Sequence, residues 1–338
     1  MKYRALLVLV CAASVISFPG AALGRVGAQA THAGFSHITI ALTSDPTSLT
    51  PAVAVDMGFF KKYGIPASYT LFSSAGDAVT AAASGAVQLA GTLSELATVG
   101  TRAKGGYIQV LCVVDRTKKQ VGFVGNSSIK SAQDVVGKTL GATFGQGNQL
   151  FALLYLQKHH IPLSQVHFVN VQPADTVAAL AHGDIDGFFG FQPWLDRAGQ
   201  AVPGAHVVNY SGDDGVYTLT LTMVATQNWL SANRAEAVAA MKALRDAANW
   251  IHSHPAQAVQ EVQSVYHLDP TTAASIFGIQ GYTFASPDSI KPLWDAAAYF
   301  WNYAKLGENI SNPKAFVSAM IYDKAYKQVV KPVIKKKK

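Results

Sequence analysis

The sequence has few of the residues on which cysteine-based or metal-based chemistry depends. Of its two cysteines, Cys11 lies in an apolar N-terminal segment and Cys112 stands alone, which leaves no intrachain disulfide and no CxxC site. The ten histidines form no HExxH motif, no GxSxG elbow is present, and the Gly145-x-Gly147 pair lacks the third glycine of a dinucleotide fingerprint. We therefore expect no metal, no cofactor and no catalytic residues.

Charged residues are also scarce, at 14% of the chain, and the net charge of +7 is concentrated at the two ends. Residues 1–30 carry three basic and no acidic residues, and residues 324–338 carry seven lysines and no acidic residue. Subtracting three and seven from +7 leaves −3 for the rest of the chain. The basic balance thus gives no support for nucleic-acid binding. The lysine tail is typical of a solvated terminus, with a weak role at an anionic membrane surface as the alternative.

The N-terminal segment has the pattern of a secretory signal peptide. Two basic residues precede an apolar run over residues 5–18, and small residues follow up to Ala30. We expect cleavage after Ala30 or after Gly24, with an uncleaved anchor as the alternative. Cys11 follows Val10 rather than a small residue, which argues against a lipid anchor. No later run of about 18 apolar residues appears, so we expect an exported, periplasmic protein.

Short β-type runs alternate with helical stretches from residue 37 onward, which predicts an α/β fold built on mostly parallel sheets. Strands are expected at 37–42, 67–72, 87–91, 108–114, 120–125, 138–144, 166–171, 185–191, 206–210 and 218–226. Helices are expected at 49–64, 76–85, 93–104, 148–159, 173–183, near 195, at 234–252, 255–266, 270–279 and 287–305, and from about 313. Gly85 and Gly183 each end an Ala-rich helix before the chain returns to a strand. This repetition predicts two similar α/β halves followed by a helical C-terminal region.

Four loops that follow predicted strands carry hydroxyls or glycine amides at the start of a helix. In open α/β sheets ligands bind outside the carboxyl ends of strands, where helix N-termini favour an anion. The candidate ligand-binding residues are Thr43, Ser44, Ser73, Ser74, Thr92, Ser94, Glu95, Thr143, Gln146 and Asn148. Because serine, threonine and asparagine are ordinary N-cap residues, helix capping alone is the alternative for any one loop.

Glu95, Arg116, Gln192 and Trp194 complete the set of candidates, each with a second interpretation. Glu95 could favour the helix dipole, or it could repel a bare anion and accept hydrogen bonds from an amine or a pyrimidine. Arg116, between the two halves, could neutralise a ligand or form a surface ion pair. Gln192 and Trp194 could close over a small ligand, with a core tryptophan as the alternative.

Four segments carry a resemblance to a known family: residues 52–65 (AVAVDMGFFKKYGI), 82–91 (AASGAVQLAG), 128–161, which includes Asp134-Val135-Val136-Gly137-Lys138, and 175–198. These segments resemble the periplasmic solute-binding proteins of ABC importers of the nitrate, sulfonate, taurine and thiamine-precursor type, over residues 37–305. The resemblance implies a two-lobed fold of type II, with residues 31–118 and 212–338 in lobe I and 119–211 in lobe II. It also implies a monomer whose cleft closes on one small ligand and delivers it to membrane permease subunits with their ATPase subunits.

Two departures from the family pattern prevent a ligand from being carried over. Phe191-Gln192-Pro193 stands where the family often has Trp-Glu-Pro, and the small-residue loop holds Gln146 and Asn148 in place of serines. Hydroxyl-rich helix starts favour an aliphatic sulfonate or taurine, while a thiamine pyrimidine precursor, an aromatic carboxylate, nitrate and bicarbonate stay open. A periplasmic sensor also stays open, as does an enzyme of the same fold, although the signal peptide and the single mature cysteine disfavour the enzyme.

Overall fold

A computed structural model of the chain describes residues 35–330, apart from the side chain of Asp214. The predicted signal peptide with its cleavage positions, and the end of the lysine tail, lie outside the described residues. Within residues 35–330, no helix has both the length and the apolar character needed to span a membrane.

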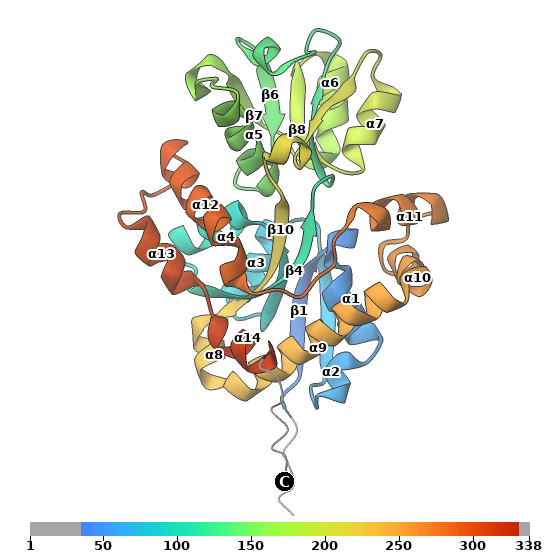
Figure 1. The fold of residues 1–338 in the computed structure, drawn as a ribbon, viewed down its shortest axis with the longest axis vertical. Helices are drawn as coiled ribbons and strands as arrows, with labels where there is room; N and C mark the ends of the chain where they lie inside the picture. Colours follow the sequence, from blue (N-terminus) through green and yellow to red (C-terminus); the bar gives the residue numbers. More distant parts are fainter. Residues whose placement is uncertain (1–34, 331–338) are drawn as a thin grey trace, which may run out of the picture. The chain divides into compact units, whose positions relative to one another are not determined.

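Two five-stranded sheets organise the fold (Figure 1). Sheet A consists of β1 (Ile38–Thr43), β2 (Ala67–Phe72), β3 (Leu89–Leu93), β4 (Ile108–Thr117) and β10 (Leu219–Thr226), in the order β2-β1-β3-β10-β4. Sheet B consists of β5 (Val121–Gly125), β6 (Thr139–Ala142), β7 (His167–Asn170), β8 (Gly187–Phe191) and β9 (His206–Tyr210), in the order β7-β6-β8-β5-β9. The predicted α/β fold and the predicted strands are confirmed. We call sheet A with the helices packed on it lobe I, and sheet B with its helices lobe II; the boundaries at 118/119 and 211/212 stay a prediction.

Each sheet has four strands in one direction and one strand in the other. β10 is antiparallel to both β3 and β4, and β5 is antiparallel to both β8 and β9. These are the two strands by which the chain enters a sheet after leaving the other one. The alternation of strands and helices predicts only the parallel pairs, because a crossover helix within one sheet produces a parallel neighbour.

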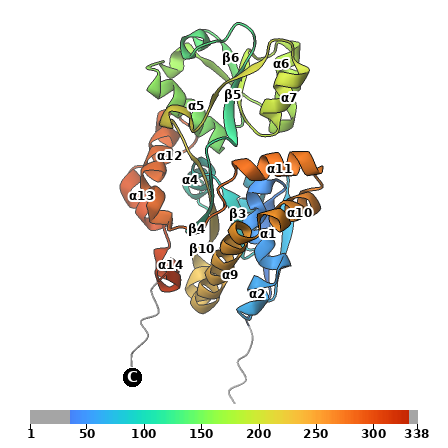
Figure 2. The same ribbon diagram turned by 45° about the vertical axis from the view of Figure 1, so that its right-hand side comes forward.

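Helices cover both faces of sheet A (Figures 1 and 2). One face carries α3 (Ala75–Ala83), α4 (Glu95–Ala103), α12 (Lys291–Tyr303) and α13 (Pro313–Met320), and the other carries α1 (Leu49–Asp56), α2 (Phe59–Lys62), α9 (Arg234–Ser253) and α14 (Asp323–Val330). The remaining helices of lobe I are α8 (Gln227–Ala232), α10 (Pro255–Tyr266) and α11 (Pro270–Ile279). Lobe II has α5 (Gly147–Lys158), α6 (Thr176–His182) and α7 (Trp194–Ala201).

The helix predictions were wrong at three points, and the structure gives a cause for two of the errors. The helix expected at 49–64 is two helices, because Gly58 adopts a left-handed φ of 72° between α1 and α2. The helix expected from about 313 is also two, because the chain breaks at Ile321 and Tyr322 to bridge to Val110 of β4. The short helix α8 was not predicted.

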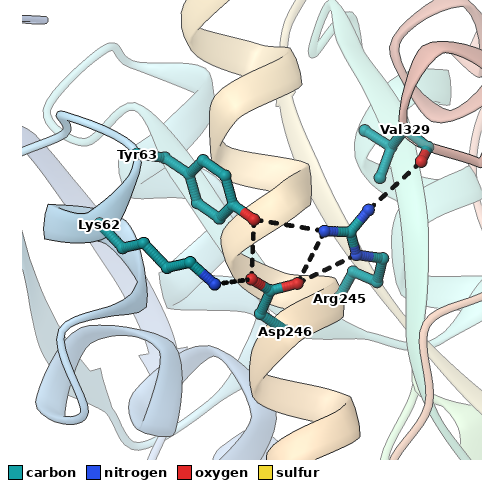
Figure 3. A network of polar contacts seen from close by, with 5 residues as sticks. All are labelled: Lys62, Tyr63, Arg245, Asp246 and Val329. Atoms are coloured by element: carbon teal, nitrogen blue, oxygen red, sulfur yellow. Dashed lines mark hydrogen bonds and ion pairs between the residues drawn. The ribbon is translucent and has the colours of Figure 1, made fainter. Parts of the chain in front are cut away.

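A polar network fixes the helices on the outer face of lobe I (Figure 3). The Asp246 carboxylate accepts hydrogen bonds from Lys62 Nζ and Tyr63 Oη, each at 2.7 Å. Arg245 donates to Asp246 at 2.7 Å, to Tyr63 Oη at 3.2 Å and to the carbonyl of Val329 at 3.3 Å. The network joins α2, α9 and α14, and none of its residues lines the cleft described next.

Candidate functional site

A cleft of about 260 Å³ lies where the carboxyl ends of the parallel strands of both sheets meet. Its walls come from the loops after β1, β2 and β3 of lobe I and after β6, β7 and β8 of lobe II, with the start of β10 between them. This volume is slightly below the range of small-molecule pockets, roughly 300–1,000 Å³. The cleft therefore suits a ligand of few non-hydrogen atoms that contacts both lobes.

Eight of the thirteen residues predicted from the sequence line this cleft. They are Thr43, Ser73, Ser74, Thr92, Ser94, Thr143, Gln146 and Gln192. Some of their side chains have another partner: Ser74 caps α3 by accepting from Asp77 N at 3.1 Å, and Thr143 Oγ1 donates to the carbonyl of Val171 at 2.9 Å. Ser74 thus caps a helix as well as lining the cleft, and direct ligand contact stays a prediction for all eight.

The other five candidates do not line the cleft. Ser44 is exposed, with its amide bonded to the carbonyl of Phe72. Asn148 is buried and uses its amide to donate to the carbonyl of Phe189 at 2.9 Å.

Trp194, Arg116 and Glu95 lie elsewhere as well. Trp194 is half-buried, with the guanidinium of Arg197 4.6 Å from its ring centroid. Arg116 is exposed in a separate depression with Lys118 and Lys119. Glu95 is fully buried next to the cleft wall. The placement of the Asn148 and Glu95 side chains depends on Phe189 and Tyr217, partners distant in the sequence, which strand and helix patterns do not reveal.

Two helix N-termini, one from each lobe, meet at the cleft. Ser94 precedes α4 of lobe I, and Gly147 is the first residue of α5 of lobe II. A Cβ atom added to Gly147 would lie 3.1 Å from Ser94 Cβ, so the two backbones are close to van der Waals contact. Ser94 is one of the residues that line the cleft, and its Oγ is buried and has no hydrogen-bond partner among the described residues. Converging helix N-termini with a free buried hydroxyl are suited to bind an oxyanion.

The carboxyl group of Glu95 lies beside this junction. Tyr217 Oη donates to Glu95 Oε2 at 2.5 Å, and Glu95 Oε1 has no partner among the described residues. Burial raises the pKa of Glu95 to about 7, against the opposing effect of the hydrogen bond from Tyr217. The ring of Tyr217 stacks on Phe151 of α5, with centroids 6.4 Å apart. Tyr217 therefore connects a buried carboxyl of lobe I to the aromatic core of lobe II.

Three hydroxyls form a closed ring on the lobe I side of the cleft. Thr43, Ser48 and Thr92 lie 2.6 to 2.8 Å from one another, oxygen to oxygen. Each hydroxyl has one proton, so the ring uses all three protons internally and leaves lone pairs as the outward groups. Thr92 also adopts φ 56°, which is strained for a β-branched residue. This part of the wall is better suited to accept hydrogen bonds than to donate them.

No lysine, arginine or histidine lines the cleft among the described residues, and its one charged side chain is Asp45. Asp45 Oδ1 accepts from Thr47 N at 3.0 Å and from the Thr47 hydroxyl. A cleft of this kind can compensate a single negative charge only by N–H groups, hydroxyls and helix dipoles. It also offers one carboxylate to a ligand that carries an amine.

Several cleft residues were missed by the sequence analysis. They are Asp45, Gln120, Asn170, Gln172, Pro173, Leu219 and Leu221. Gln172 follows β7 in the same way that the predicted residues follow their strands, so the same rule would have found it, whereas Asn170 is the last residue of β7 itself. Gln120 is different, because it lies between the lobes, where its side chain accepts from Gln280 at 2.8 Å and donates to the Gln192 carbonyl at 3.2 Å.

The described residues form no cluster of metal ligands at this site. Among residues 35–330, no three His, Cys, Asp or Glu side chains are grouped so that they could hold a metal ion. The thiol of Cys112 is buried, and burial raises its pKa.

Comparison with known sequences relates the chain to one family. The sequence model described as NMT1/THI5 like matches residues 46–258. The taurine-binding periplasmic protein of Escherichia coli (strain K12) is 28% identical over 183 residues, which are 53% of this chain and 56% of that protein. The chain thus matches little more than half the length of this relative.

Solved structures share the fold at low sequence identity. The alkanesulfonate-binding protein SsuA from Xanthomonas axonopodis pv. citri, bound to MOPS, aligns with a TM-score of 0.71 at 16% identity, over 86% of this chain and 99% of that one. The desulfurization enzyme DSZB aligns with a TM-score of 0.58 at 14% identity, over 82% of this chain and 96% of that one. The fold therefore occurs both in a binding protein and in an enzyme.

Proposed function

Because the chain belongs to the NMT1/THI5-like family, we propose that it is the extracytoplasmic substrate-binding protein of an ABC importer. On this proposal the signal peptide exports the chain, the cleft captures a small ligand, and the two lobes close on it before delivery to the permease and its ATPase subunits. The similarity to a taurine-binding periplasmic protein and the fold shared with SsuA support this function.

The ligand that the cleft favours is a small sulfonate, with taurine first. The observation that carries this choice is the meeting of α4 and α5 at Ser94 and Gly147, beside an unpartnered buried hydroxyl. A sulfonate has a single, dispersed negative charge and accepts hydrogen bonds in three directions, which matches N–H and O–H donors without a cation. Asp45 and the outward lone pairs of the hydroxyl ring favour taurine over a plain alkanesulfonate, because taurine also carries an ammonium group.

An aminopyrimidine of the thiamine-precursor type is the second candidate. Phe144 and Phe191 line the lobe II wall, and 42% of the Phe144 side chain is exposed, so a flat ring could stack there. Asp45 and the nearby amides could then bind ring amines. Nitrate and an aromatic carboxylate gain no comparable support, since neither has a donor for Asp45.

A thermal-shift screen of the mature protein tests the ligand. At 100 times its dissociation constant, a ligand stabilises the folded state by about 2.7 kcal/mol, which corresponds to a rise in Tm of about 5 °C. We expect this rise with taurine and a smaller one with ethanesulfonate. A rise with aminopyrimidines and none with sulfonates would contradict the sulfonate proposal. Sulfonate buffers such as MOPS must be avoided, because they belong to the proposed ligand class.

The same sample separates a binder from an enzyme. We expect taurine to be recovered unchanged after long incubation with the protein, as judged by mass spectrometry. Release of sulfite, or any other conversion of the bound ligand, would contradict a purely binding function.

A further inference from the structure

We propose that capture of an oxyanion in the cleft is coupled to uptake of one proton by the carboxyl group of Glu95. This inference rests on the proposed function and specifies the charge state of the site that binds the ligand. It makes Glu95 a specificity-determining residue that acts from behind the cleft wall, since its side chain is fully buried and does not line the cleft.

Glu95 lies at the start of α4, next to the cleft wall. It is the first residue of α4 and directly follows Ser94, a residue of the cleft wall whose buried hydroxyl has no partner among the described residues. Tyr217, which bonds Glu95, has its Oη 3.2 Å from the place of a Cβ on Gly147, at the start of α5. The carboxyl group therefore lies beside the point where the two helix N-termini meet. A negative charge there opposes an oxyanion, whereas the neutral acid does not.

The charged and titratable groups around Glu95 determine whether another side chain compensates its carboxyl group. α3, α5, α12, β4 and β10 pack near α4, and Tyr217 is the only titratable side chain bonded to Glu95 among the described residues. The charged side chains of the neighbouring elements make contacts of their own. The Asp77 carboxylate accepts a hydrogen bond from the Ser74 hydroxyl, and the Asp115 carboxylate accepts one from Gly281 N. Arg102 donates to the Ile108 carbonyl, and Lys291 donates to Asp295. Arg116 is exposed, and Lys158 lies at the far end of α5. In the cleft itself, Asp45 is engaged with Thr47.

The direction of the coupling follows from the two charge states. Burial places the pKa of Glu95 at about 7, and a bound oxyanion raises it further, because like charges disfavour ionisation. A group whose pKa rises on binding favours the complex at low pH, and this contribution is lost as the pH rises above the pKa of the free protein. With a free-state pKa of about 7, the dissociation constant should rise about tenfold between pH 6 and pH 8.

The test is calorimetric titration of the full mature protein with taurine at pH 6, 7 and 8, in two buffers of different ionisation enthalpy that contain no sulfonate. We expect a tenfold weakening between pH 6 and pH 8 and an uptake of about half a proton per taurine at pH 7. Ethanesulfonate, which has no amine, should show the same pH dependence and so excludes titration of the ligand as its cause. Binding of taurine with pH-independent affinity would overturn this inference and leave the proposed function intact. Absence of sulfonate binding at every pH would overturn both.

Three variants separate titration of Glu95 from a structural role. Glu95→Gln keeps the shape without the charge and should bind with an affinity independent of pH. Tyr217→Phe removes the hydrogen bond that lowers the pKa of Glu95 and should move the affinity change to higher pH. Glu236→Gln is the matched control, because Glu236 is also a buried glutamate with an unpartnered oxygen but lies on α9, away from the cleft. A pH profile that is unchanged in Glu95→Gln would overturn the inference.

Discussion

The close approach of α4 and α5 can be tested by adding one methyl group, in the variant Gly147→Ala. The new Cβ would lie 2.7 Å from Leu219 Cδ1, 3.1 Å from Ser94 Cβ and 3.2 Å from Tyr217 Oη. Leu219 Cδ1 is the end of a flexible side chain that also lines the cleft, whereas Ser94 Cβ can move only together with the start of α4. The two helix N-termini must therefore separate by a few tenths of an ångström.

Two opposing effects decide the size of the change in stability. Overpacking of this kind costs about 1–3 kcal/mol, while replacement of glycine by alanine at a helical position returns up to about 1 kcal/mol. We expect a net loss of about 1 kcal/mol in the free energy of unfolding. Because the proposed anion site is formed by the same contact, the affinity for taurine should fall about tenfold, or about 1.4 kcal/mol.

Gly76→Ala provides the matched control. Gly76 is also in the first turn of a helix, α3, which begins at the cleft, but the nearest atom to its added Cβ is Ser74 Oγ at 3.6 Å. This variant should be as stable as the parent or slightly more stable, with unchanged affinity. The measurements are urea unfolding followed by tryptophan fluorescence, and calorimetric titration with taurine. A Gly147→Ala protein that behaves like Gly76→Ala in both assays would refute the tight contact between the helices.

Three further predictions concern single groups. Ser94→Ala should leave the urea midpoint nearly unchanged, because the hydroxyl has no partner to lose, yet weaken taurine binding about tenfold in calorimetry. Asp246→Asn should lower the free energy of unfolding by roughly 2 kcal/mol in urea, because it weakens charge-assisted bonds from Lys62 and Arg245; an unchanged midpoint would show that the network contributes nothing. Burial raises the pKa of Glu95 and of Asp115 to about 7 in the folded protein, so the contribution of these two groups to stability falls as the pH rises toward 8, by roughly 2 kcal/mol for each group. Urea midpoints at pH 5 and pH 8 test this sign, and Glu95→Gln should remove its own share of the difference.

Local signals in the sequence were sufficient to predict most of the secondary structure. The helices α10 and α11 begin at Pro255 and Pro270, as predicted, because proline needs no amide partner in the first turn of a helix. The direction of β5 and β10 could not be predicted in this way. Their neighbours in each sheet come from segments distant in the chain, and no local pattern records that pairing.

The same distinction separates the predicted residues that line the cleft from those that do not. Ser94 and Thr143 line the cleft because every loop after a parallel strand reaches the same edge of its sheet. Glu95 directly follows Ser94, but its side chain turns inward to accept a hydrogen bond from Tyr217, which is 122 residues away in the chain. Asn148 likewise bonds Phe189, 41 residues away. A helix start indicates that a residue is near the cleft, but its long-range partner decides whether the side chain enters it.

The composition of the cleft wall also has a kinetic consequence. Without a lysine, arginine or histidine among the described lining residues, the site has no side-chain cation to attract an anion from a distance. The association rate for a sulfonate should therefore change little with ionic strength, whereas clefts lined with cations bind anions more slowly as salt increases. For a protein proposed to act outside the cytoplasm, this means that uptake would proceed at a similar rate in dilute and in salty surroundings.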